Sequence, residues 1–317
     1  MMFKNAVIYT FTKEWFISQG DLESELWEEL FKPVGSQEIG RTGWVPALPG
    51  DEYMVFDTNE CLFLRLRSDK KVLKESAIKR KVEDIASGIE REQGRKVRKK
   101  EKEEIRETVL LSHLPHALID STYTVGYIDL QKQWLVVEAS SFKGAEEFTS
   151  FLRRTLGSLP VRMPALEHNP GFVITGAIKP GIDDQPLLIR FNLGEECTMV
   201  GLDGEKASFK DMDLTSEEVT DHITESGMSV SSLRLAMEDR MSFTLTEDFR
   251  VKKIKFLDEF QEDLLNYEPE DEDVDAGLSY ARATLFLMTE EFRELFDALI
   301  ESMGGIEESF DPLEGLE

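Results

Sequence analysis

Histidine and cysteine side chains are the groups in this sequence that could bind a metal ion or attack a substrate. They are His113, His116, His168, His222, Cys61 and Cys197. His113 and His116 are three residues apart, as in many helical metal pairs, but Pro115 lies between them and no cysteine or acid completes the set. Both cysteines lie in apolar segments, which favours buried thiols in a reducing compartment over a disulfide or a zinc site. We therefore expect no metal ion and no cofactor.

A metal-dependent nuclease is the one hydrolytic activity that the acidic residues suggest. Asp69 is followed by Lys70 and Lys71, directly after an expected strand that ends at Arg67. This chemistry requires further carboxylates on the same ion, and only Asp51 or Asp57 could be nominated for that role. The sequence has no G-x-x-x-x-G-K-[ST], G-x-S-x-G or H-E-x-x-H motif. It therefore favours a protein that is not an enzyme, with the nuclease as an alternative.

The charge of the chain is distributed very unevenly. The 317 residues carry a net charge of −26, and contact between an acidic surface and duplex DNA would be repulsive. Residues 65–106, however, hold 16 Lys and Arg against 9 Asp and Glu, a local balance of +7 that leaves −33 on the rest of the chain. Such polarity could guide a polyanion to one place and repel it elsewhere. A solvated pair of charged helices is the alternative interpretation.

The composition predicts a globular protein with two or three domains. Hydrophobic residues make up 41% of the chain and aromatic residues 9%, which is too apolar for a disordered protein. No run of about 18 or more apolar residues predicts a membrane span. The first residues lack the long apolar stretch and cleavage site of a signal peptide. We therefore expect a cytoplasmic protein.

The basic region is expected to form two helices. Ile78, Val82, Ile85 and Ile89 are spaced 4, 3 and 4 residues apart, which is the apolar stripe of one helix. Gly94 interrupts this pattern, and a second helix is expected over residues 96–112. Cations at spacings of 4, 3, 4 and 4 form a ridge if the helix continues, or crowd the tip of a hairpin if the chain turns. They are Arg91, Arg95, Arg98, Lys102 and Arg106.

Helical and extended segments alternate along the rest of the chain. An amphipathic helix is expected over residues 143–156, with Gly157 at its end, and a strand over residues 171–178. Thr215 and Glu218 have the spacing of a capping box at a helix N-terminus. Residues 258–275 include ten acidic residues and no Lys or Arg.

The last quarter of the chain contains the clearest amphipathic helix. Its apolar stripe predicts either a core helix or a helix that seals a subunit interface. The stripe consists of Phe292, Leu295, Phe296, Leu299, Ile300 and Met303.

Short segments distributed in order along nearly the whole chain form a recognisable set. The segments are Phe3-Lys4-Asn5, Gly35-Ser36-Gln37, Gly43-Trp44-Val45-Pro46, Glu92-Gln93-Gly94-Arg95-Lys96, Leu114-Pro115, Leu156-Gly157-Ser158-Leu159-Pro160, Asp213-Leu214-Thr215-Ser216-Glu217-Glu218 with His222-Ile223, Lys253-Ile254-Lys255-Phe256-Leu257, and Phe286-Leu287-Met288-Thr289. Each segment is weakly specific alone, but their ordered combination is specific. Together they resemble the RdgC family of bacterial recombination-associated DNA-binding proteins.

The resemblance implies an α+β fold. A central antiparallel sheet region would carry a projecting helical hairpin, the tip, and a helical base, in a horseshoe-shaped subunit that forms a ring dimer. Residues 1–73 and 115–200 would be the central region, residues 74–114 the basic hairpin, residues 201–305 the base region and residues 306–317 an acidic disordered tail.

The resemblance also implies a function. Family members bind DNA without sequence preference as homodimers and antagonise the RecA recombinase, so the expected partners are duplex DNA, with single-stranded DNA possible, and a recombinase. The protein would encircle duplex DNA in the nucleoid and have no membrane partner. The rival hypothesis is an acidic interaction module that binds a recombination protein directly.

Two groups of residues are the candidate functional sites. The expected DNA contacts, from the resemblance and from the basic region, are Lys71, Lys79, Arg91, Arg95, Lys96, Arg98, Lys99, Lys100 and Lys102. The expected dimer contacts are the stripe of the final helix and Leu118, which lies where relatives close the ring and can have an aromatic residue.

Overall fold

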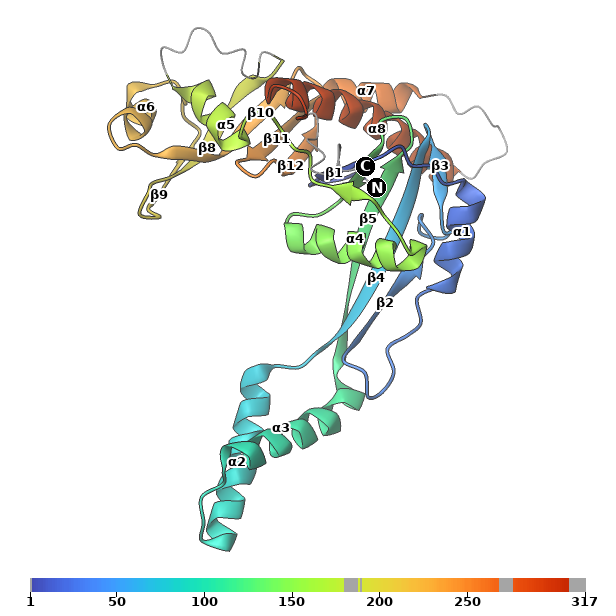
Figure 1. Ribbon diagram of the computed structural model, residues 1–317, viewed down its shortest axis with the longest axis vertical. Helices are drawn as coiled ribbons and strands as arrows, with labels where there is room; N and C mark the ends of the chain where they lie inside the picture. Colours follow the sequence, from blue (N-terminus) through green and yellow to red (C-terminus); the bar gives the residue numbers. More distant parts are fainter. Residues whose placement is uncertain (1, 180–187, 189, 268–275, 308–317) are drawn as a thin grey trace, which may run out of the picture. The chain divides into compact units, whose positions relative to one another are not determined.

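The computed structural model describes residues 2–179, 188, 190–267 and 276–307 and has mixed α and β structure (Figure 1). The chain divides into two compact units. Unit 1 comprises residues 1–19, 56–63 and 126–317, and unit 2 comprises residues 20–55 and 64–125. Two of the four boundaries fall within long strands, β4 (Cys61–Val72) and β5 (Leu118–Asp129). Among the described residues, no helix is both long enough and apolar enough to cross a membrane.

The first sheet of unit 1 is antiparallel and has both faces covered. Its strand β1 (Val7–Phe11) pairs with β6 (Trp134–Val137) on one side and with β7 (Val161–Arg162) on the other. β6 also pairs with residues 126–129 of β5, and β3 (Phe56–Thr58) pairs with residues 61–63 of β4. Val7 and Ile8 are both fully buried although they point to opposite faces, so apolar groups pack on each side.

Helix α4 (Phe142–Leu156) is packed closely against this sheet. Ser141 caps it by accepting a hydrogen bond from the Gly144 amide. Gly157 ends it in a left-handed conformation, as the sequence predicts. The buried Phe148 ring reaches the backbone of β5 at Gly126. A Cβ atom on Gly126 would lie 2.7 Å from the Phe148 ring, so only glycine allows this approach.

The second sheet of unit 1 is formed by the C-terminal half of the chain. Its order is β12 (Val251–Phe256), β11 (Met241–Thr246), β10 (Ser229–Met237), β8 (Asn192–Val200) and β9 (Lys206–Lys210), with antiparallel neighbours throughout. The helices of this half are α5 (Pro170–Ile178), α6 (Glu217–Thr224), α7 (Asp258–Asn266) and α8 (Ala276–Ser302). The expected acidic tail, apart from residues 306 and 307, and residues 268–275 of the acidic segment lie outside the described residues.

Unit 2 contains helix α1 (Gln19–Glu28) except its first residue, strand β2 (Gly40–Val45), and the helices α2 (Glu75–Gln93) and α3 (Lys99–His113). A short 3₁₀ turn, η1 (Leu114–His116), follows α3. β2 pairs antiparallel with residues 65–70 of β4. The Glu23 carboxylate on α1 accepts hydrogen bonds from the amides of Met54 and Val55, each at 2.7 Å, and thereby fixes the loop before β3.

Two sequence predictions are wrong at helix starts. Residues 171–178 form α5 and not a strand, because Asn169 accepts a hydrogen bond from the Phe172 amide and Pro170 occupies the first helical position. The capping box does not form, because the Thr215 hydroxyl donates to the Asp213 carboxylate at 2.7 Å and α6 begins after Ser216. The side-chain capping bond is therefore present at α5 and absent at α6.

The apolar stripe of α8 packs inside unit 1. Phe292, Leu295, Phe296, Leu299 and Met303 are fully buried, and Ile300 is half-buried. The Phe292 ring centroid lies 5.9 Å from that of Phe3, and the Phe296 ring lies 5.9 Å from Trp134. This corrects the assignment of the five buried residues to a dimer interface, because their side chains are already covered by their own chain.

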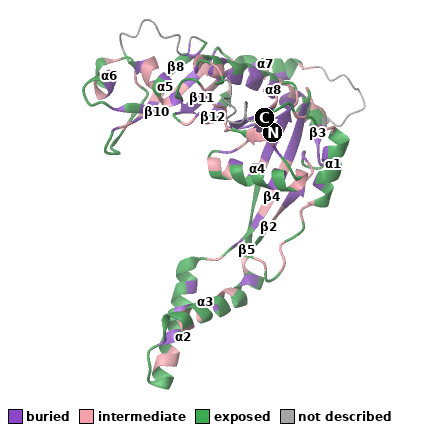
Figure 2. Ribbon diagram, viewed as in Figure 1, coloured by how far each residue is buried: buried purple, intermediate pink, exposed green. Residues whose placement is uncertain are grey.

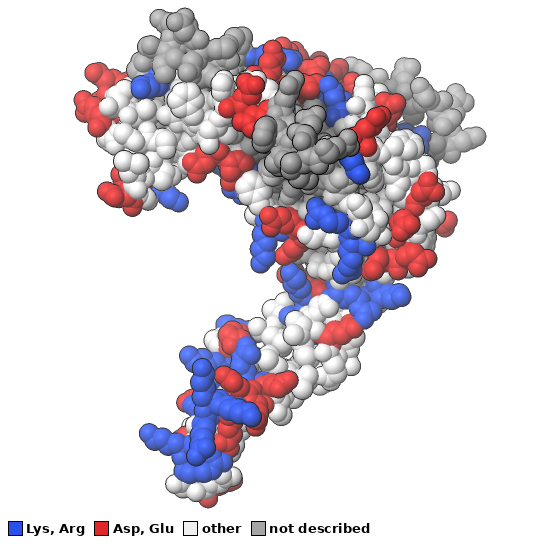
Figure 3. All heavy atoms as spheres, viewed as in Figure 1, with Lys and Arg blue, Asp and Glu red and all other residues white. Residues whose placement is uncertain are grey.

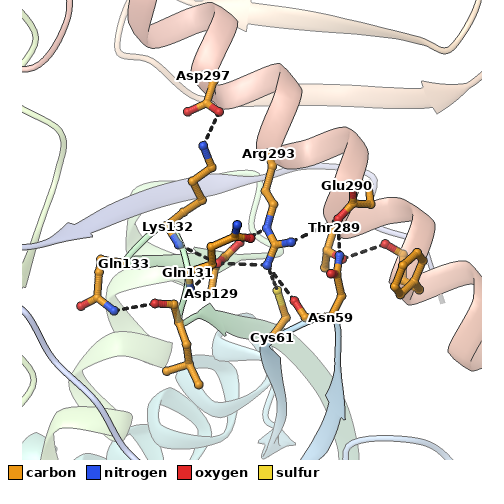
Figure 4. Close-up of polar contacts among 12 residues, drawn as sticks. Asn59, Cys61, Asp129, Gln131, Lys132, Gln133, Thr289, Glu290, Arg293 and Asp297 are labelled. Atoms are coloured by element: carbon orange, nitrogen blue, oxygen red, sulfur yellow. Dashed lines mark hydrogen bonds and ion pairs between the residues drawn. The ribbon is translucent and has the colours of Figure 1, made fainter.

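A buried ion pair joins α8 to two turns, one between β3 and β4 and the other between β5 and β6 (Figure 4). The Arg293 guanidinium donates to both oxygens of Asp129, at 2.7 and 3.2 Å, and to the carbonyl of Asn59 at 2.7 Å. The Asp129 carboxylate is fully buried and also accepts from the amides of Gln131 and Lys132. Arg293 therefore holds both turns against one face of α8.

The same ion pair stabilises the turn between β3 and β4, which has positive φ angles. Asn59 and Glu60 form the β3–β4 turn with φ values of 54° and 57°, a conformation that costs about 1 kcal/mol or more for residues other than glycine. The Arg293 contact to the Asn59 carbonyl offsets this cost.

Both cysteines are buried. Cys61 follows the β3–β4 turn, and burial raises the pKa of its thiol well above the usual range. Burial also raises the pKa of Cys197, to about 11, so both thiols are protonated at neutral pH.

We predict that Asp129→Asn lowers the free energy of unfolding by about 3–5 kcal/mol, because it leaves Arg293 charged and buried without its partner. Urea denaturation followed by circular dichroism measures this. Asp297→Asn is the matched control, since Asp297 pairs with Lys132 on an exposed face of α8 and its loss should cost at most about 1 kcal/mol. Equal losses in the two variants would contradict the assigned role of the buried pair.

Candidate nucleic-acid interface

Helices α2 and α3 pack together over a small apolar cluster. Ile78, Val82 and Val109 are buried in it, with Ile105 and Leu110 partly buried at its edge. Gly94 ends α2 with φ of 65°, in the left-handed region that glycine tolerates, so the expected break is at this residue. The chain turns here, and the basic residues do not continue as a ridge along one helix.

The apolar stripe of α2 differs in part from its sequence prediction. Ile85 is exposed and Ile89 is half-buried, whereas Ala86 is buried. Both helices carry mostly exposed residues (Figure 2). The α2–α3 pair therefore has a narrow core and a large solvated surface.

Three cations of the α2–α3 pair are bound to carboxylates. Lys102 pairs with Glu83, and Arg106 pairs with Glu75, each at 3.0 Å. Because the later cation pairs with the earlier carboxylate, these bonds join antiparallel helices. Arg95 donates two hydrogen bonds to Glu101, at 2.8 and 2.7 Å, and they lower the pKa of that carboxyl.

Other cations of the α2–α3 pair are exposed and form no ion pair with a carboxylate among the described residues. They are Lys79, Arg91, Lys96, Arg98, Lys99 and Lys100. The guanidinium of Arg91 donates to the carbonyl of Ser87 at 3.3 Å. Blue side chains gather over α2 and α3 in Figure 3. The expected DNA contacts on α2 and α3 therefore fall into two groups: Arg95 and Lys102, which are paired with carboxylates, and the six residues above, which we call the free cations.

Four of the free cations lie at or just before the N-terminus of α3, namely Lys96, Arg98, Lys99 and Lys100, whereas Lys79 lies in the second turn of α2. Arg98 is the N-cap residue and makes no side-chain capping bond, while Lys99 and Lys100 occupy the first turn. Positive side chains are unfavourable at this end of a helix, because the helix dipole is positive there. An anion placed at this end would interact favourably with both the amides and the cations.

Lys71 is placed differently from the other expected contacts. It is buried on β4, and its ammonium group donates to the carbonyls of Gly35 and Ser36 at 2.7 and 2.6 Å. These bonds hold the loop before β2. We therefore assign Lys71 a structural role and leave it out of the candidate interface.

Asp69, the residue nominated for a nuclease site, is bound to arginine. Its carboxylate accepts two hydrogen bonds from Arg67, at 2.8 and 2.9 Å, which lower its pKa. Arg67 would compete with a metal ion for the same oxygens. In the part of the chain that the structure describes, no group of three or more His, Cys, Asp or Glu is arranged to hold a metal ion.

Leu118, the expected dimer contact at the start of β5, is 80% exposed. The neighbouring Ile119 is also exposed, so two apolar side chains face solvent directly after η1. Isolated exposed leucines are common, but adjacent ones at a strand end can form a contact surface. Unlike the stripe of α8, this site is available to a second chain.

Sequence reasoning missed two exposed cations on α2. Arg80 and Lys81 follow Lys79 and have no carboxylate partner among the described residues. The run of three consecutive basic residues was the signal that could have identified them.

Comparison with known proteins gives one consistent result. The family model RdgC, described as "Putative exonuclease, RdgC", matches residues 1–306. A protein of Psychromonas ingrahamii is 33% identical over 310 residues, covering 96% of this chain and 99% of the relative. Proteins of an Enterobacter species and of Proteus mirabilis are 32% and 33% identical, with 96% of this chain and 98% and 99% of the relatives covered. All three are named "Recombination-associated protein RdgC".

Proposed function

This chain belongs to the RdgC family, and we propose that it is a DNA-binding protein without sequence preference that acts in homologous recombination. The observation that carries the proposal is the group of free cations on α2 and α3, in a chain whose net charge is −26. Because most of the chain is acidic, these cations are the surface groups that would attract a polyanion. The DNA contacts are Lys79, Arg91, Lys96, Arg98, Lys99 and Lys100, with Arg95 and Lys102 weaker because of their carboxylate partners.

The proposed mechanism is electrostatic. Lysine and arginine side chains contact phosphates and release condensed counterions, which gives affinity but no base readout. The acidic remainder of the chain repels the duplex and thereby restricts it to the α2–α3 pair. The proposed mechanism includes no catalytic step. In support, Arg67 is hydrogen-bonded to both oxygens of Asp69, the carboxylate that a nuclease would need as a metal ligand.

The proposal extends to the assembly and its place in the cell. Two horseshoe-shaped subunits, each with the α2–α3 hairpin as its tip, form a ring-shaped homodimer that encircles duplex DNA in the nucleoid and limits the action of a RecA-type recombinase. The exposed Leu118 supports a contact between the tips, and the resemblance to ring-forming relatives motivates the rest. The buried stripe of α8 supplies no contact in this proposal.

We predict that charge reversal of Lys96, Lys99 and Lys100 weakens binding to every DNA sequence alike. Removing one lysine–phosphate interaction should reduce the slope of log affinity against log salt by about 0.9, so the three reversals together flatten it by up to about 3. Fluorescence anisotropy at several salt concentrations measures both effects. Stability should change by only about 0.5 kcal/mol per site, because these side chains are solvated.

Reversal of Lys13, Lys32 and Lys179, which are exposed and outside the α2–α3 pair, is the matched control. It changes the net charge equally and should leave most of the affinity intact. If both triple variants lose affinity equally, the α2–α3 assignment is wrong. If neither loses affinity, the rival acidic interaction module becomes the better account, and recombinase capture in the absence of DNA would support it.

We also predict that the protein leaves linear and supercoiled DNA intact in the presence of Mg²⁺ or Mn²⁺. Gel electrophoresis of end-labelled DNA over several hours detects exonuclease and endonuclease products. Cleavage that disappears in an Asp69→Ala variant would overturn the non-enzymatic proposal and place the chemistry on β4.

Leu118→Glu should weaken self-association by about tenfold or more, because it places a charge in a contact that the proposal makes apolar. Sedimentation equilibrium measures the dimer dissociation constant. Leu202→Glu, at a fully exposed leucine of unit 1, is the control and should have no effect. An unchanged dissociation constant for Leu118→Glu would exclude the tip contact.

A further inference from the structure

A hollow of about 490 Å³ lies in unit 2 beside the first half of α2, where the chain leaves β4 and where it enters β5. Its volume is within the range of about 300–1,000 Å³ that small-molecule sites occupy. The hollow uses none of the proposed DNA contacts, and it shares one residue, Leu118, with the proposed dimer contact.

Basic groups dominate the polar lining of this hollow. Lys74, Arg80 and Lys81 line it from α2 and its N-cap, and His113 and His116 line it from the end of α3 and from η1. Asp84 is the acidic residue of the lining. Among the described residues, Lys74, Arg80 and Lys81 have no carboxylate partner, so their charges are not neutralised. Three unpaired cations around one hollow repel each other, and a bound anion would remove that repulsion.

The rest of the lining is apolar. Val72, Leu73 and Leu118 contribute exposed or half-buried side chains, and Ile78 contributes a buried one. A ligand that fits this lining has an anionic end for the lysines, the arginine and the histidines, and a flatter, less polar part for the aliphatic wall. Arginine and lysine side chains form strong charge-assisted hydrogen bonds with phosphate oxygens, and histidines add donors.

We propose that this hollow binds the phosphate-bearing end of a nucleotide. The phosphate would be bound by Lys74, Arg80 and Lys81, with His113 and His116 donating to it, and the nucleoside would lie against the aliphatic wall. Two sources supply this chemistry: a free nucleoside triphosphate, and the 5′-terminal nucleotide of a DNA strand. The proposal does not depend on the DNA contacts of α2 and α3, since the two sets of residues are different.

Two measurements on the full chain distinguish the sources. Isothermal titration with ATP, dATP and inorganic pyrophosphate tests the free ligand. Fluorescence anisotropy with one oligonucleotide, carrying either a 5′-phosphate or a 5′-hydroxyl, tests the strand end. The proposal expects either measurable nucleotide binding or a preference of several-fold for the 5′-phosphorylated strand.

The Arg80→Ala, Lys81→Ala double variant should reduce that binding or preference by about tenfold or more, since it removes two charge-assisted interactions. The Arg80→Lys, Lys81→Arg variant keeps both charges and should retain most of it. The Lys99→Ala, Lys100→Ala variant is the matched control: it should lower general DNA affinity and leave nucleotide binding and the 5′-phosphate preference unchanged.

The absence of both nucleotide binding and a 5′-phosphate preference in the unmodified protein would overturn the proposal. An equal loss of nucleotide binding or of the 5′-phosphate preference in the control variant would also overturn it. The hollow would then contribute no more than the general electrostatic attraction between the basic surface and phosphate. If instead the assignment of the DNA contacts to α2 and α3 is wrong, the result is different: the Lys99→Ala, Lys100→Ala variant keeps its general DNA affinity.

Discussion

The narrow apolar contact between α2 and α3 is the interaction on which the proposed DNA surface depends. Ile78, Val82 and Val109 form its buried part, which is small for two helices of 19 and 15 residues. Helices of this length are marginal in water alone, so their packing decides whether they persist. The cross-helix pairs of Glu83 with Lys102 and of Glu75 with Arg106 add to this contact. The carboxylates that stabilise the pair therefore also neutralise some of its cations. The proposed DNA contacts whose charge stays free lie near the loop between the helices, apart from Lys79.

Unit 1 is organised by a different kind of interaction. The bidentate bond between Arg293 and the buried Asp129 fixes α8 against two turns, and the aromatic rings of Phe292 and Phe296 fill the space beside it. A charged pair is costly to bury, so it confers stability only while both partners are present. The consequence for function is indirect. Because the apolar stripe of α8 is buried within its own chain, the proposed self-association would use other side chains, and the exposed Leu118 is the candidate.

The sequence was sufficient for the elements whose signal is local. The end of α4 at Gly157 and the break at Gly94 follow from backbone preferences that act within a few residues. It was insufficient where two signals conflict. The β-branched residues of 171–178 indicate a strand, yet Asn169 and Pro170 start a helix there.

The candidate site was predictable as a region but not residue by residue. The density of Lys and Arg in residues 65–106 identifies the region from the sequence. The burial of Lys71 and the pairing of Arg95 with Glu101 depend on which chain segments meet in three dimensions, and no spacing rule contains that information. The apolar stripe of α8 shows the same limit, since its pattern is identical for a core helix and for an interface helix.

The proposed function requires that DNA contacts the free lysines of α2 and α3. Lysine acetylation followed by mass spectrometry, with and without a saturating duplex, tests it most directly on the unmodified protein. If DNA lies on these helices, it protects Lys96, Lys99 and Lys100 from acetylation and leaves Lys13, Lys32 and Lys179 as reactive as before. Equal protection of the two groups, or protection confined to lysines outside α2 and α3, would contradict it.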